Sequence, residues 1–297
     1  MSRPGNTSHI TDSTKKADPQ EGAGSTSPQN GAGTGAQHAT GHVTEVRSDR
    51  GQPRPSGLEI ARMPSAAERT RTLVHSTCSS ALLITGLEGA RPEQLEPRLR
   101  NVGPEGDLFL LFPADSPVVR AATHAQDDEL SAVLEITDVA PVSVPHRIRG
   151  RAWITGWLTR VPGLAPPGSM TLRLEVNEAY VDDLWGACAV EPEAFAAALP
   201  DPLARDETEL LQHLHAHHGE QVRSLCGLVD REGREGHDGN RRIKSVTPLA
   251  LDRFGLRVRF QDTDGRCFDA RFEFPEPVTG LGPLRRAMRR LFEAATD

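Results

Sequence analysis

Polar and apolar residues alternate, or the apolar residues form short runs, through the middle of the chain, which is a pattern typical of β-strands. The strands that this pattern predicts cover residues 80–86, 106–113, 130–139, 146–161 and 171–185. Two amphipathic segments, 64–77 and 116–128, predict short helices, and Ser116 and Pro117 are suited to begin the second. Many strands with few helices between them favour a small antiparallel barrel over a doubly wound parallel sheet.

The predicted strand 146–161 carries arginine at every second position near its start. Its alternation predicts an inward face with Ile148, Ala152, Ile154 and Gly156, and a solvent-exposed face with Arg147, Arg149, Arg151 and Thr155. Gly150 marks the expected bend of the strand. The three arginines are either a solvated strand face or an anion-binding group, because guanidinium binds phosphates and carboxylates with paired hydrogen bonds.

The pattern changes after residue 206, where helical spacing of apolar residues comes first. Residues 206–228 predict one helix, residues 243–275 a three-stranded meander, and residues 281–296 a closing helix. The closing helix turns apolar residues inward (Leu284, Met288, Leu291, Phe292) and arginines outward (Arg285, Arg286, Arg289, Arg290). The predicted fold class is therefore α+β: an antiparallel barrel followed by a small α-β-β-β-α domain.

The first 57 residues contain only three branched aliphatic residues, Ile10, Val43 and Val46, and no aromatic residue. Such a segment buries too little apolar surface to offset the entropy of ordering. We therefore predict a disordered tail over residues 1–60, a barrel domain over 61–203 and a C-terminal domain over 204–297.

Composition limits the kind of function. The net charge is −7 and the pI about 5.9, which argues against a nucleic-acid-binding protein. No apolar run approaches 18 residues and the N-terminus has no apolar signal region, so we expect a cytoplasmic protein without a membrane span. The four cysteines are widely scattered, which indicates reduced thiols.

Four of the eleven histidines lie between residues 213 and 218. On a helix, His213 and His217 share a face and form a possible metal pair, as do His215 and His218 less well. No third ligand is placed by the sequence, and His218 falls on the apolar stripe. The cluster therefore leaves three interpretations: packing against the neighbouring domain, contact with haem or another tetrapyrrole, or a divalent metal site.

A family resemblance rests on several of these segments together. His213 and His218 match the two histidines of a His-x-Asn-x-x-His-like pattern, with His215 in the asparagine position, and the segments 252–255 and 274–275 match as well. With the strand–helix–strand pattern upstream, the chain resembles the split-barrel, pyridoxamine-phosphate-oxidase-like proteins that carry a C-terminal domain of unknown function 2470, as in haem-utilisation proteins.

The resemblance implies a homodimer that binds a tetrapyrrole such as haem, or flavin mononucleotide (FMN), with His213, His218, Arg120, Arg147 and Arg149 as cofactor-binding residues. The chain departs from the family in three ways: a loop replaces a helix at 159–170, no histidine follows His237, and no serine-lysine or paired-arginine motif matches the flavin-phosphate pattern well. These departures favour a binding or regulatory module with a degenerate active site over an FMN- or haem-dependent oxidoreductase of the haem-degrading type.

Overall fold

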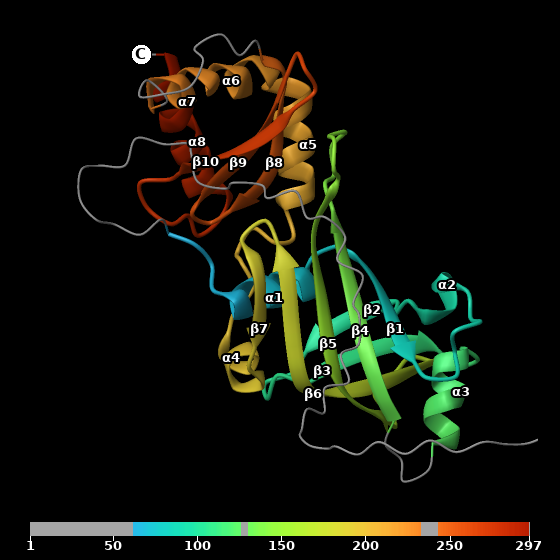
Figure 1. Ribbon diagram of the computed structural model, residues 1–297. Helices are drawn as coiled ribbons and strands as arrows, with labels where there is room; N and C mark the ends of the chain where they lie inside the picture. Colours follow the sequence, from blue (N-terminus) through green and yellow to red (C-terminus); the bar gives the residue numbers. More distant parts are fainter. Residues whose placement is uncertain (1–61, 126–129, 233–242, 297) are drawn as a thin grey trace, which may run out of the picture. The chain divides into compact units, whose positions relative to one another are not determined.

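A seven-stranded antiparallel sheet forms the first part of the computed structural model, which describes residues 62–125, 130–232 and 243–296. Its strands are β1 (Ser79–Ile84), β2 (Leu99–Val102), β3 (Leu108–Pro113), β4 (Leu130–Val139), β5 (Ile148–Val161), β6 (Ser169–Asp183) and β7 (Gly186–Val190). They are ordered β1-β4-β5-β6-β3-β2, with β7 paired to β6. The sheet curls strongly into a half-barrel, as Figure 1 shows, which confirms the predicted antiparallel architecture.

One row of buried side chains shows how strand alternation builds the core of this sheet. Leu82 of β1, Leu134 of β4, Ile154 of β5 and Ala179 of β6 are paired in register and all are buried. Burying a Leu or Ile side chain fully is worth about 1.5–3 kcal/mol. The inward positions of neighbouring strands therefore contribute jointly to one core.

Short helices accompany the sheet: α1 (Ala66–His75), α2 (Pro92–Leu95), α3 (Pro117–His124) and α4 (Pro192–Ala197). Ser65 caps α1 in a capping box with Glu68, and the Ser116 hydroxyl accepts a hydrogen bond from the Val119 N–H at the start of α3. The predicted helices at α1 and α3 are confirmed. The sequence pattern did not predict α2 or β2, since each has only four residues.

The predicted faces of β5 are wrong at its beginning. Ile148 is 52% exposed, whereas Arg149, predicted to be in solvent, is only 7% exposed. The cause is a β-bulge, in which Val139 pairs with Ile148 but Asp138 pairs with Gly150. The extra residue reverses the alternation, so the arginine turns inward.

A three-stranded meander with helices forms the second part: α5 (Glu207–His217), α6 (Gly219–Ser224), α7 (Cys226–Glu232), β8 (Ile243–Asp252), β9 (Gly255–Asp262), β10 (Cys267–Glu273) and α8 (Leu281–Thr296). The α-β-β-β-α order and the inward and outward faces of α8 are as predicted. The prediction of one helix over 206–228 is wrong, because the helix breaks at His218, whose φ of −125° and ψ of 25° are not helical. Gly219 follows this break, and glycine favours helix ends over helix interiors.

Arginines connect the two parts, whose described residues belong to one compact unit. Arg149 of β5 binds Glu207 of α5, and Arg253 after β8 binds Glu68 of α1. Arg259 of β9 donates to the backbone carbonyls of residues 145–146. These contacts do not test the predicted domain boundary near residue 203, which stays a prediction. Within the described ranges, the helices are too short or too polar to span a membrane.

Candidate functional site

The four clustered histidines divide between the linings of two cavities that both include residues of α5. His213 and His218 line an apolar cavity, whereas His215 and His217 line a polar one. The structure therefore does not form the single histidine-rich site that the sequence cluster alone would suggest.

The apolar cavity, which we call the α5–α8 cavity, has a volume of about 540 Å³ and lies between α5, α6, β8 and α8. Its apolar lining consists of Leu210, Leu214, Leu251, Leu284, Met288 and Phe292. Its polar lining consists of His213, His218, Gln221, Arg285, Arg289, Glu293 and Thr296. An apolar concavity of a few hundred Å³ with a few polar groups is typical of small-molecule sites.

The break in the helix brings the two histidines of this cavity together. Residues five apart on a continuous helix would point about 140° apart around its axis. Here His218 ends α5, with its N–H donating to the Leu214 carbonyl, and its Nε2 lies 3.3 Å from the Nε2 of His213. His217 stacks on the other side of the His213 ring, with centroids 4.8 Å apart. The His213 imidazole thus contacts two others.

Two arginines of α8 lie at the same cavity as the histidines. Arg285 and Arg289 are exposed, as predicted for the outer face of that helix, but both also line the α5–α8 cavity. Their spacing of four residues places them on one face, next to Leu284 and Met288 of the apolar stripe. The spacing of the two arginines was visible in the sequence, but the sequence did not show that α5 lines the same cavity.

The arginines that the sequence proposed as cofactor ligands lie elsewhere. Arg120 on α3 donates to the Asp115 carbonyl, and Arg147 donates to the Ala140 carbonyl. Arg149 is buried and its two terminal nitrogens are hydrogen-bonded, as described below, and the lining of the α5–α8 cavity includes none of the three. The structure therefore does not bring them together with His213 and His218.

Arg149 neutralises two carboxylates. It donates to both oxygens of Glu207, at 2.8 and 3.0 Å, and to Asp138 Oδ1 at 2.8 Å. Burial alone would lower the pKa of Arg149, but the charges of Glu207 and Asp138 outweigh it and raise that pKa, so the guanidinium stays charged. Burial raises the pKa of Glu207, against the opposing effect of Arg149. This cluster fixes the first residue of α5 rather than offering a free cation to a ligand.

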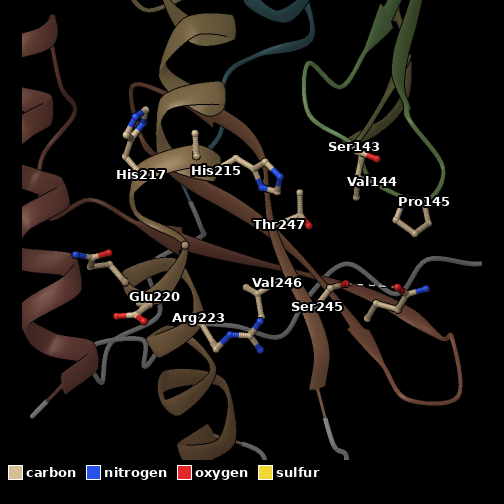
Figure 2. A pocket seen from close by; sticks show the side chains of 14 residues that line it. Ser143, Val144, Pro145, His215, His217, Glu220, Arg223, Ser245, Val246 and Thr247 are labelled. Atoms are coloured by element: carbon tan, nitrogen blue, oxygen red, sulfur yellow. Dashed lines mark hydrogen bonds between the residues drawn. The ribbon is translucent and has the colours of Figure 1, made fainter.

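The polar cavity has a volume of about 960 Å³. Figure 2 shows the side chains that line it, among them His215 of α5, Glu220 and Arg223 of α6, Thr247 of β8 and the loop 143–145. The lining mixes opposite charges and hydroxyls and has few apolar side chains. In the part of the chain that the structure describes, no three histidine, cysteine or acidic side chains are grouped so as to hold a metal ion.

The half-barrel sheet fits the split-barrel class of folds that the sequence predicted. No family model matches the chain, and no match is found among curated proteins. Among solved structures, the chain is similar to a haem-binding protein from Mycobacterium smegmatis, with a TM-score of 0.51 and 20% identity over 79% of this chain and 99% of that one. A protein of unknown function from Agrobacterium tumefaciens aligns with a TM-score of 0.32 and 15% identity over 80% of this chain and 100% of that one. At 20% identity the first likeness supports the fold.

Proposed function

We propose that the protein is a binding module for haem or a related tetrapyrrole, and that the α5–α8 cavity is the binding site. The observation that carries the proposal is the combination of an apolar cavity, two imidazoles and two guanidiniums in one place. The haem-binding protein with a similar fold supports the same ligand class. We include in this proposal that the chain is related to split-barrel proteins with the domain of unknown function 2470, and that it is located in the cytoplasm.

The residues present suit the chemical parts of a haem. Leu210, Leu284 and Phe292 offer apolar walls to the macrocycle. A histidine is a common axial ligand of haem iron, and the bound iron would supply the site for that ligand. Arg285 and Arg289 suit the propionates, because guanidinium binds carboxylates with charge-assisted hydrogen bonds.

One of the two histidines, His213 or His218, would hold the iron, and their Nε2 atoms lie 3.3 Å apart. The second imidazole would then remain as a hydrogen-bonding neighbour of the first.

A haemin titration of the full chain, followed at the Soret band, tests this site. We expect a saturable Soret shift for the natural chain and weaker binding, by about tenfold or more, for whichever of His213→Ala and His218→Ala removes the ligand. His215→Ala and Arg286→Ala are matched controls, because His215 and Arg286 lie on the same helices but outside the lining. Equal affinity in all four variants would refute the site. A parallel titration with FMN tests the flavin alternative.

We also propose that two copies associate through the outer face of the half-barrel sheet. Trp157 is 47% exposed, Tyr180 42% and Leu83 41%, and strand pairing places them on one face of the sheet, on β5, β6 and β1, with β4 between β1 and β5. Trp153 extends the patch, with its ring centroid 6.0 Å from that of Tyr180. Contiguous exposed aromatic residues of this kind mark interaction surfaces. Light scattering should give a dimer for the natural chain and a monomer for Trp157→Glu; a monomeric natural chain would refute the proposal.

A further inference from the structure

The separation of the two Nε2 atoms carries information about a ligand other than haem. A distance of 3.3 Å is long for a hydrogen bond between two ring nitrogens, whose usual N–H···acceptor range is about 2.7–3.2 Å. In the described part of the chain no other hydrogen bond to either imidazole is found. Both ring edges therefore face one small space without a better partner.

That separation equals the distance between two ligand nitrogens in a tetrahedral metal site. Two imidazole nitrogens, each about 2.0–2.1 Å from a zinc ion and separated by the tetrahedral angle, lie about 3.3–3.4 Å apart. Adjacent ligands of a square-planar ion at the same bond length would lie only about 2.9 Å apart. The geometry selects a tetrahedral ion such as Zn²⁺ over square-planar Cu²⁺.

We propose that His213 and His218 form a two-histidine site for Zn²⁺ at the mouth of the α5–α8 cavity. His213 is exposed and His218 half-buried, so an ion can reach both nitrogens from solvent. Because the described residues gather no third protein ligand, water completes the coordination.

The helix break is what makes this chelate possible. On a continuous helix, metal pairs are found at positions three or four apart, such as His213 and His217. In this chain those two rings instead stack, with 28° between their planes, while His218 turns its edge to His213 at 67°. The tilted His213–His218 pair brings the two Nε2 atoms within 3.3 Å of each other, and no such approach of ring nitrogens is found for the stacked His213–His217 pair in the described residues.

The zinc site goes beyond tetrapyrrole binding and does not rest on it. Both ligands would nevertheless need a lone pair from the same histidines, so Zn²⁺ and haem iron would exclude each other. If both proposals hold, saturating Zn²⁺ should weaken haemin binding to the natural chain. If only one of the two ligands binds, no competition is seen. The zinc titration and the haemin titration each report on one ligand, so the failure of one proposal is distinguishable from the failure of the other.

The test is calorimetric titration of ZnCl₂ into the full chain, prepared without an affinity tag and stripped of metal. Losing even an outer-shell partner of a metal ligand costs about 10- to 100-fold in affinity, so His213→Ala and His218→Ala should each bind at least about tenfold more weakly. His215→Ala is the matched control and should bind like the natural chain. Equal binding by the three variants would overturn the proposal.

A second measurement needs no variant. Co²⁺ replaces Zn²⁺ in such sites, and tetrahedral Co²⁺ absorbs visible light far more strongly than octahedral Co²⁺. We expect the intense tetrahedral spectrum when one equivalent of Co²⁺ is added to the natural chain, and its loss on adding Zn²⁺. A weak octahedral spectrum would overturn the tetrahedral site even if the histidine variants failed to fold.

Discussion

Replacing Arg149 by methionine removes the charge that neutralises two carboxylates while keeping a side chain of similar length. The Arg149 guanidinium makes four hydrogen bonds: two to Glu207, one to Asp138 and one to the Leu249 carbonyl at 2.9 Å. Its side chain is 6% exposed, and those of Asp138 and Glu207 are 13% and 16% exposed. Solvent therefore screens this cluster weakly, and little water can replace the lost guanidinium.

The expected loss of unfolding free energy is about 3–5 kcal/mol, because breaking a buried ion pair on one side leaves the other charge uncompensated. This is a large share of the roughly 5–15 kcal/mol that stabilises a typical domain. Arg173 provides a more exposed control: its side chain is 37% exposed, and it pairs with Glu175 at 3.1 Å and with Asp107 at the longer distance of 3.6 Å. Arg173→Met should cost no more than about 1 kcal/mol.

Urea unfolding followed by circular dichroism measures both variants against the natural chain. The double variant Arg149→Met/Glu207→Leu should recover part of the loss, because it removes a buried carboxylate together with its partner. If Arg149→Met destabilised the protein no more than Arg173→Met, the buried cluster would not be a determinant of stability, and the argument from burial would be refuted.

The cost of Arg149→Met should also depend on pH. Burial raises the pKa of Glu207 and Arg149 opposes that rise, so removing Arg149 raises the pKa further. A carboxylate whose folded pKa lies above its unfolded value, about 4.3 for Glu, favours the folded state at low pH and loses that effect as the pH rises through the folded pKa. The variant should therefore lose less stability at pH 5 than at pH 8. An equal or larger loss at pH 5 would contradict this reasoning.

Two further changes test local packing and thiol chemistry. Gly156→Ala should cost at least about 2 kcal/mol in urea unfolding, because a Cβ there would lie 1.9 Å from the Glu175 carbonyl oxygen, whereas Gly89→Ala, with open space around it, should stay within about 0.5 kcal/mol. Burial, together with the charge of Asp138, raises the pKa of Cys78 to about 12. Iodoacetamide at pH 8 should therefore alkylate the exposed Cys188 at least about tenfold faster than Cys78. Peptide mass spectrometry measures both rates. Equal costs for the two glycines, or equal rates for the two cysteines, would contradict these expectations.

Much of the fold could be predicted from the sequence because each long strand carries its own alternation. The long strands at β4 and β6, and Ser116 as the cap before α3, are local signals that the structure confirms. The short elements β2 and α2 have too few residues for a periodic pattern. They depend on pairing with β3 and on neighbouring side chains, which one segment of sequence does not show.

The candidate site was only partly predictable, for the same reason. His213 and His218 were singled out by their spacing, and the structure places both at one cavity. The other wall comes from α8, whose Arg285 and Arg289 looked like an ordinary solvated helix face. The packing of distant segments decides which amphipathic helix faces contact each other. The sequence of either helix alone does not determine that contact.

The two errors of local reasoning fall at the residues that organise the site. Strand alternation predicted Arg149 in solvent, but a bulge turns it inward, where it holds Glu207, the first residue of α5. Helical periodicity predicted one continuous helix, but the chain breaks at His218, which turns that imidazole toward His213. Departures from local rules tend to persist where function or long-range packing requires them. Since one departure anchors the start of α5 and the other shapes its end, α5 is the element on which ligand binding should depend most.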